Sequence, residues 1–442
     1  MKTIAGMLLT ILLTAQSAGC LTPQSDKVTV TGHLTCPAVS TAGGKVYLRL
    51  AVTTPRFHRS SRTPVNLSVV LDRSGSMADE SKIDFAKAAL RTLVDQLHPE
   101  DIFSLVIYDD EVEVLRPAAR VGRTKEEIRS LVDEIMPRGS TNLGGGMLEG
   151  FHQVERNTGR EYINRVILLS DGLANRGITD PHRLAAIAHK QREHAISLST
   201  IGVGLDYNEN LMVGLSENGG GNYYFLESSR NLASVLRKEF DRLGDVMAQN
   251  VTIEIELGRG VRLLDAIGYE HSVAGRTASI TVGDLYGEES REITLELDVP
   301  PGTGALTLAN GKLISRSASN GGDLGSFESG IRYEADAASI DRQRDMTEQA
   351  RADVAVSTRD VHRAMESLDK GDREEATRTL ARAGQVLMAS PAASASGAAS
   401  DAIRQQAERL QGYTDSLQSD SKDSRRAKKA IQYQNYQQQK QR

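Results

Sequence analysis

The sequence predicts an α/β domain with a doubly wound, mostly parallel sheet, accompanied by an antiparallel β-sandwich and a C-terminal helical region. Between about residues 64 and 245, nearly continuous apolar runs such as "NLSVVL" and "RVILLS" alternate with amphipathic stretches. Buried parallel strands alternate with their crossover helices in this way. After residue 246, "VTIEIEL" and "ITLELDV" instead alternate apolar and polar residues at period two, which is typical of antiparallel strands. Asn310-Gly311 is interpreted as a hairpin turn.

A short segment before the α/β domain has the same strand pattern. "KVYLRLAV", within residues 27–62, alternates at period two, and a lone hairpin there would be only marginally stable. We therefore expect residues 27–62 and 246–335 to form one β-sandwich, with the α/β domain of residues 64–245 inserted between its strands. The alternative is that these strands pack against the α/β domain.

The C-terminal part is expected to be helical over residues 340–418. "LDKGDREEATRTL" breaks one helix and starts another, which resembles the turn inside a tetratricopeptide repeat, although only one such hairpin is visible. Residues 421–442 carry seven Lys or Arg residues, one Asp and many Gln residues. That composition predicts a basic, Gln-rich disordered tail, with contact to anionic lipid or another polyanion as the alternative.

Residues 1–20, "MKTIAGMLLTILLTAQSAGC", have the charge and apolar pattern of a secretory signal peptide and are too short to span a bilayer as a helix. The ending "SAGC" resembles the lipobox of bacterial lipoproteins, which predicts lipidation of Cys20 and a lipid-anchored protein of the bacterial cell envelope. Leu21 after this cysteine favours the outer membrane. The alternative is ordinary cleavage, a secreted or periplasmic protein, and pairing of Cys20 with Cys36, the only other cysteine.

Composition and missing motifs argue against several functions. The net charge of -5 provides no global basic field, so no nucleic-acid partner is expected. No G-x-S-x-G and no H-E-x-x-H occur, and "GGG" at 144–146 lacks the G-K-[ST] of a phosphate-binding loop. We therefore predict no catalytic residues and no enzymatic activity. With no Trp and 4% aromatic residues, carbohydrate recognition is also disfavoured.

Hard oxygen ligands follow two of the predicted strands. "DRSGSMADE" comes directly after "NLSVVL", "SDGLANRG" overlaps the end of "RVILLS", and "PRGSTNLGGGM" lies between them. Because the carboxyl ends of parallel strands meet at one edge of a sheet, five side chains are expected to converge on a cation: Asp72, Ser74, Ser76, Thr141 and Asp171. Thr141 is expected on an exposed loop. Mg²⁺ prefers such oxygen ligands, with Mn²⁺ or Ca²⁺ as alternatives.

The same residues carry a resemblance to a known family. Asp72-x-Ser74-x-Ser76, Thr141 and Asp171 match the metal-ion-dependent adhesion site of von Willebrand factor type A domains, and the resemblance covers about residues 64–245. It implies that one position on the metal stays open for a Glu or Asp of a partner protein.

The expected function is therefore metal-dependent protein binding at the cell envelope, for adhesion or for assembling a complex. The alternative is a structural subunit of an envelope complex whose metal site is not used for partner binding.

Asp79 and Glu80 have two interpretations. Their spacing after Asp72 matches the acids that hold an adjacent Ca²⁺ in integrin β subunits, which would make them ligands of a second cation. Acids are also favoured in the first turn of any helix by its dipole. A solvated first turn is the preferred interpretation.

Overall fold

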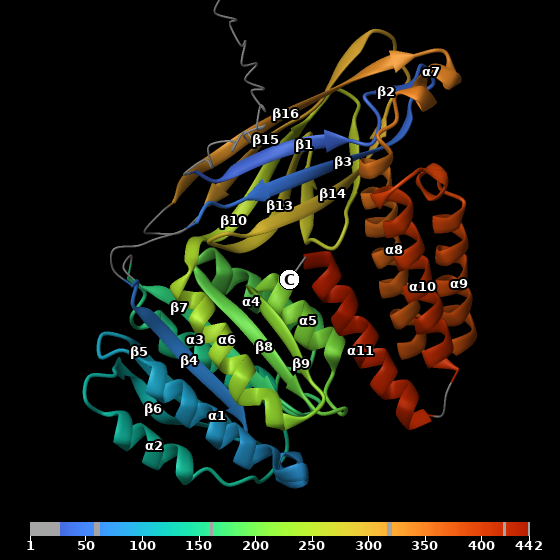
Figure 1. The fold of residues 1–442 in the computed structure, drawn as a ribbon. Helices are drawn as coiled ribbons and strands as arrows, with labels where there is room; N and C mark the ends of the chain where they lie inside the picture. The colour runs from blue at the N-terminus through green and yellow to red at the C-terminus, as the bar shows by residue number, and fades with distance from the viewer. Residues whose placement is uncertain (1–26, 57–61, 160–161, 316–320, 419–420, 441–442) are drawn as a thin grey trace, which may run out of the picture.

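The structure is a computed structural model that describes residues 27–56, 62–159, 162–315, 321–418 and 421–440. The predicted signal peptide and Cys20 lie outside these ranges. Within them, no helix combines the length and the apolar character that crossing a bilayer requires. Figure 1 shows three parts: an α/β domain, a β-sandwich at one end of it, and a helical region beside both.

The α/β domain contains a six-stranded sheet in the order β6-β5-β4-β7-β8-β9. All neighbouring strands are parallel except β5 and β6. Every residue of β4, β5, β7 and β8 is buried, as the continuous apolar runs predict. The strands are β4 (Val65–Asp72), β5 (Ile102–Tyr108), β6 (Val112–Arg120), β7 (Ile163–Ser170), β8 (Ile196–Val203) and β9 (Gly220–Leu226).

Helices cover both faces of this sheet, which confirms the doubly wound class. The apolar sides of α1, α2 and α6 share one core with one face, and α3, α4 and α5 share another core with the opposite face. The helices are α1 (Lys82–Gln96), α2 (Lys125–Asp133), α3 (Leu143–Glu155), α4 (Pro181–Glu193), α5 (Glu209–Asn218) and α6 (Leu232–Gly244); two short 3-10 segments are η1 (Gly75–Ser81) and η2 (Ser229–Asn231).

Strands from both sides of the α/β domain make up the sandwich. Strand β3 pairs with β14 from Gly44↔Val299 to Thr53↔Ser290, and the two sheets have the orders β1-β3-β14-β11 and β12-β13-β10-β15-β16-β2. The strands are β1 (Thr29–Leu34), β2 (Ala38–Ser40), β3 (Gly44–Thr53), β10 (Val246–Leu257), β11 (Arg262–Ala266), β12 (His271–Ala274), β13 (Thr277–Tyr286), β14 (Ser290–Val299), β15 (Ala305–Ser315) and β16 (Gly322–Glu334). Their inward side chains form one shared core.

Asn310-Gly311 is not a hairpin turn, so that prediction was wrong. Both residues lie inside β15, where Gly311 pairs with Phe327 of β16. A Cβ on Gly311 would lie 2.2 Å from Cε1 of Phe327. The glycine is needed because the aromatic ring of the neighbouring strand covers its backbone.

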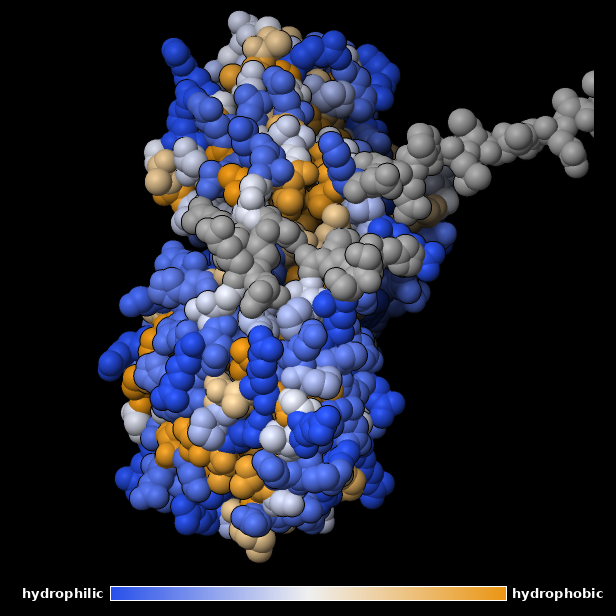
Figure 2. All heavy atoms as spheres, turned by 90° about the vertical axis from the view of Figure 1, so that its left-hand side faces the viewer, coloured by the Kyte–Doolittle hydropathy of each residue, from blue (hydrophilic) through white to orange (hydrophobic). Residues whose placement is uncertain are grey.

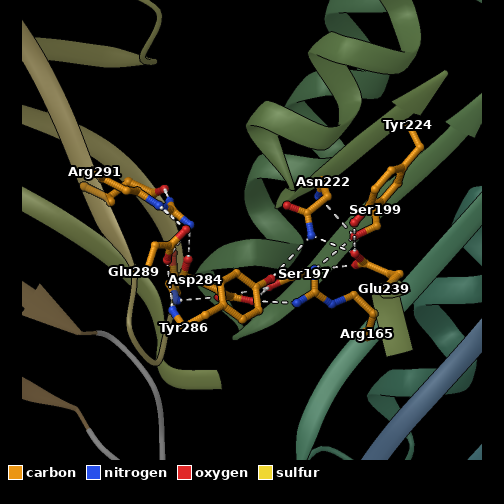
Figure 3. A network of polar contacts seen from close by, with 12 residues as sticks. Arg165, Ser197, Ser199, Asn222, Tyr224, Glu239, Asp284, Tyr286, Glu289 and Arg291 are labelled. Carbon is orange, nitrogen blue, oxygen red and sulfur yellow. Dashed lines mark hydrogen bonds and ion pairs between the residues drawn. The ribbon is translucent and has the colours of Figure 1, made fainter. Parts of the chain in front are cut away.

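The sandwich and the α/β domain are joined by buried polar contacts (Figure 3). Arg165 of β7 is fully buried, and its guanidinium donates to Asp284 of β13 and to Ser199 of β8. Glu239 of α6 accepts from Ser199, Asn222 and Tyr224 on the other side of this cation. Arg165 lies near the start of β7, so the sandwich covers the amino ends of the strands and leaves their carboxyl ends free (Figure 1). In Figure 2 the sandwich and the α/β domain form two lobes with a largely hydrophilic surface.

The helical region contains α7 (Ala337–Arg342), α8 (Met346–Asp369), α9 (Arg373–Met388), the 3-10 segment η3 (Pro391–Ser394), α10 (Ala398–Leu417) and α11 (Ser421–Lys440). Helices α8 and α9 form the expected hairpin, turning at Gly371 with φ +82°. The Asp372 side chain then accepts the N–H of Glu375 and caps α9. Helices α8 to α11 share one apolar core.

The prediction of a disordered tail was wrong, because residues 421–440 form helix α11. It lies between the α/β domain and α8 (Figure 1). Tyr436 packs edge-on against Tyr223 of β9, with 5.6 Å between ring centroids, and Lys429 donates to Glu209 of α5 over 2.6 Å. The helix is held in place because the α/β domain supplies an aromatic partner for Tyr436 and an acidic partner for Lys429.

Candidate metal centre

The carboxyl ends of β4 and β7 lie side by side and bring two predicted acids together. Asp72 is the last residue of β4, and Asp171 follows Ser170, the last residue of β7. The two strands pair in parallel up to Leu71↔Leu169. The hydroxyl of Ser170 donates to Oδ2 of Asp72 over 2.8 Å, so the ends of the two strands are also tied by a side chain.

Asp72 is a buried carboxylate that orients its own loop. Its exposed fraction is 0%, and its Oδ1 accepts the N–H of Ser74 over 2.8 Å. Burial raises the pKa of Asp72 to about 6, although hydrogen bonds from Ser74 and Ser170 favour its charged form. The groups around it therefore compensate its negative charge only in part, and a cation at this edge would stabilise it.

Three further oxygens lie in a chain beside it. The Oγ atoms of Ser74 and Ser76 are 3.1 Å apart, and Oγ of Ser76 donates to Oδ1 of Asp171 over 2.8 Å. Oxygens bound to Mg²⁺ in octahedral array lie about 2.1 Å from the ion and hence about 3.0 Å from each other. The spacing of this chain therefore fits three neighbouring ligands of one Mg²⁺ ion.

Thr141 comes to the same place from the loop before α3. A Cβ on Gly172 would lie 3.4 Å from Oγ1 of Thr141 and 3.6 Å from Oγ of Ser76, so both hydroxyls lie beside this glycine. The backbone of Thr141 is fixed by Asn175, whose Oδ1 accepts its N–H over 2.9 Å. Thr141 is 4% exposed; the expectation of an exposed side chain was wrong because the loop after Asp171 folds over it.

All five predicted residues thus lie at one edge of the sheet. In the described part of the chain, no three His, Cys, Asp or Glu side chains converge as metal ligands, so a cation here depends on the hydroxyls. This donor set, two carboxylates with neutral hydroxyl oxygens, fits the hard cation Mg²⁺.

Asp79 and Glu80 are not in the first turn of α1. They lie in η1, where Asp79 is extended and Glu80 has φ 51°, and both side chains are exposed. They line a cleft of about 780 Å³, together with Lys82 and with Arg425 and Arg426 of α11. The preferred interpretation was wrong about the helical turn and correct about solvent exposure.

Lys82 is a residue of this site that sequence reasoning missed. Its Nζ donates to Oδ2 of Asp171 over 2.7 Å, and its side chain is 7% exposed. Its position in the sequence could have indicated this role, because Lys82 is the first residue of α1, where the helix dipole disfavours a cation.

The comparisons with known proteins identify the domain that carries the site. The family model of the von Willebrand factor type A domain matches residues 66–238. Residues 66–238 are a von Willebrand factor type A (VWA) domain. VWA domains typically mediate protein–protein interaction or adhesion, and they commonly bind a divalent metal at the metal-ion-dependent adhesion site.

Two relatives in sequence match about half of this chain. The uncharacterized protein YfbK of Escherichia coli (strain K12) is 33% identical over 207 residues, 46% of this chain and 36% of the relative. Inter-alpha-trypsin inhibitor heavy chain H3 of Mesocricetus auratus is 27% identical over 230 residues, 49% of this chain and 26% of the relative. The chain therefore spans only about a quarter to a third of the length of these relatives.

Two solved structures share the fold over nearly the whole chain. A von Willebrand factor type A protein from Catenulispora acidiphila has a TM-score of 0.73 at 15% identity and covers 93% of this chain and 97% of its own. The ArnB paralog VWA2 from Sulfolobus acidocaldarius has a TM-score of 0.61 at 18% identity, covering 92% and 98%. The combination of VWA domain, sandwich and helical region thus recurs as a unit.

Proposed function

We propose that this protein is a divalent-metal-dependent protein-binding module of the cell envelope, which captures an acidic side chain of a partner for adhesion or complex assembly. The observation that carries the proposal is the run of closely spaced oxygens from Ser74, Ser76 and Asp171 at the carboxyl edge of the VWA sheet. The sandwich lies at the opposite edge (Figure 1), so a partner has access to this one.

Each residue has a distinct role in this proposal. Ser74, Ser76 and Thr141 offer neutral oxygens, Asp171 offers Oδ1, and Asp72 orients the loop through the N–H of Ser74. A bound Mg²⁺ would supply the positive charge that attracts a carboxylate. Because the three hydroxyls are neutral, only the carboxylates of Asp72 and Asp171 offset the charge of the ion.

The second candidate is a structural subunit in which the metal site does not bind the partner. The contacts that favour it are those that join the three parts of the chain, namely Arg165 with Asp284 and Lys429 with Glu209. In that case the sandwich or the helical region would carry the interaction surface.

The envelope location is proposed from the sequence of residues 1–21 alone. Lipidation of Cys20 would anchor the chain close to β1, which begins at Thr29, and the outer membrane is favoured by Leu21. Secretion into the periplasm or medium, with Cys20 free to pair, is the alternative. Cys36 is buried, and its Sγ lies 3.4 Å from the carbonyl oxygen of Ile340.

Affinity capture with crosslinking from envelope extracts tests the proposal. We expect capture in Mg²⁺ by the wild type, loss of capture in chelator, and loss of capture by Thr141→Ala in Mg²⁺. Thr92→Ala is the matched control, because its hydroxyl donates only to the Ala88 carbonyl within α1. Capture that persists in chelator and in a folded Thr141→Ala protein would reject metal-dependent binding and support the structural subunit.

A further inference from the structure

Lys82 occupies a position where a lysine is electrostatically unfavourable. It is the first residue of α1, and the helix dipole gives this end of a helix a partial positive charge. The two preceding residues, Glu80 and Ser81, have φ 51° and 55°, left-handed values that strain residues other than glycine. The chain adopts this turn as it brings Lys82 inward.

The two oxygens of the Asp171 carboxylate have different partners, the hydroxyl of Ser76 and the ammonium of Lys82. Nζ of Lys82 lies 2.7 Å from Oδ2, and Oγ of Ser76 lies 2.8 Å from Oδ1. Oδ1 therefore faces the other predicted ligands, while Oδ2 faces the lysine. A Cβ on Gly204 would lie 3.4 Å from Cε and 3.5 Å from Nζ of Lys82, so the loop after β8 lies close beside the end of the lysine side chain.

This pair changes the charge of the loaded site. With Asp72 and Asp171 ionised, the two carboxylates would neutralise a divalent cation completely. The ammonium of Lys82, in contact with Asp171, leaves one positive charge in excess. Two like charges held a few ångströms apart in a partly buried site repel each other, so Lys82 also opposes entry of the cation.

We propose that Lys82 sets the charge of this metal centre: it weakens binding of the metal alone and makes the loaded centre select an anion as its remaining ligand. This inference rests on the proposed function and adds the residue that creates the preference for a carboxylate. Lys82 acts through Asp171 and the electrostatic field, so it is a positioning residue and not a metal ligand.

The test uses Mn²⁺ titrations of the full chain, followed by electron paramagnetic resonance, with and without sodium acetate at constant ionic strength set by sodium chloride. In Lys82→Met we expect Mn²⁺ affinity to rise roughly tenfold or more, because the competing charge is gone. In the wild type, acetate should increase the affinity for Mn²⁺. In Lys82→Met, this acetate-dependent increase in Mn²⁺ affinity, the acetate linkage, should be smaller. Lys82→Arg keeps the charge and should restore the wild-type pattern in both measurements.

Lys87→Met is the matched control. Lys87 is also buried on α1, but its Nζ donates to the carbonyl of Asp133 over 3.0 Å, away from the predicted ligands. Its Mn²⁺ affinity and acetate linkage should equal those of the wild type. Lys82→Gln, which keeps a hydrogen-bond donor without the charge, replaces Lys82→Met if that variant does not fold.

The outcomes separate the inference from the proposed function. Equal or weaker Mn²⁺ binding by the folded neutral variants would overturn the inference, because it would show that Lys82 only supports Asp171. An acetate effect that is present in the wild type and equally large in the neutral variants would overturn it too. Tighter Mn²⁺ binding by Lys82→Met without any acetate linkage in the wild type would uphold the charge effect and reject carboxylate capture.

Discussion

The guanidinium of Arg165 and the carboxylate of Asp284 form an ion pair of 2.7 Å between the VWA domain and the sandwich, with side chains 0% and 1% exposed. Glu239 lies on the other side of the cation, 3.6 Å from Nη1. Burial opposes the charged form of Glu239, but Arg165 and three hydrogen bonds outweigh it and hold the pKa of Glu239 below its usual value. One cation thus compensates carboxylates from two parts of the chain.

Replacement of Arg165 should therefore affect both parts at once. Arg165→Met leaves Asp284 and Glu239 buried without a cation, and we expect a loss of about 3–5 kcal/mol in the free energy of unfolding, measured by urea denaturation. Arg262→Met is the control, since Arg262 pairs with Asp298 at the surface with a 72% exposed side chain, and it should change stability by less than about 1 kcal/mol. Equal effects of the two variants would show that the buried pair does not hold the lobes together.

The glycines of α3 are expected to be needed for packing, not for binding phosphate. A Cβ on Gly150 would lie 2.4 Å from Cγ2 of Val70 on β4, so Gly150→Ala should destabilise the protein by about 1–3 kcal/mol. Gly384 of α9 has open space around it, and Gly384→Ala should stabilise by about 0.4–1 kcal/mol. Urea denaturation of both variants checks the contrast, which would be refuted if they shifted stability in the same direction.

Docking of α11 should weaken in acid. Burial opposes the charged form of Glu209, but Lys429 and Lys428 outweigh it and hold the pKa of Glu209 below its usual value. Because the pKa of Glu209 is lower in the folded protein than in the unfolded chain, its ionised carboxylate stabilises the docked helix at pH values above the unfolded pKa of about 4.5. This stabilisation is lost as the pH falls through the pKa of Glu209 in the folded protein. We expect the hydrogen-exchange protection of α11 amides to fall below about pH 4.5, ahead of that of α1 amides.

The matched variants for α11 are Glu209→Gln and Glu227→Gln. Glu209→Gln should lower the protection of α11 already at pH 7 and remove its dependence on acid. Glu227→Gln removes an exposed partner of Arg426 and should have little effect. Unchanged protection in Glu209→Gln at pH 7 would contradict a role for this carboxylate in docking.

Anchoring at Cys20 gives a prediction about location. Cys20→Ser should move the protein from the membrane to the soluble envelope fraction, as measured by fractionation and immunoblotting. Cys36→Ser should stay with the membrane, because its buried thiol lies in the folded part of the chain. A Cys20→Ser protein that remains on membranes at the wild-type level would rule out this anchor.

The sequence by itself determined the VWA domain and the neighbourhood of the five predicted ligands. The reason is that the signals are local: apolar runs predict buried strands, and Asp72 and Asp171 stand directly after two of them. Once the strands pair in parallel, the topology places their carboxyl ends together without further information.

Tertiary structure alone decided which charges act on that site and where the tail lies. Lys82 donates a hydrogen bond to Asp171, which is 89 residues away in the sequence, and Lys429 donates one to Glu209, which is 220 residues away. No periodicity within either segment encodes its partner. Position 311 requires a glycine because a ring on the neighbouring strand covers its backbone. Burial and charge compensation between distant segments become visible only when the chain is folded.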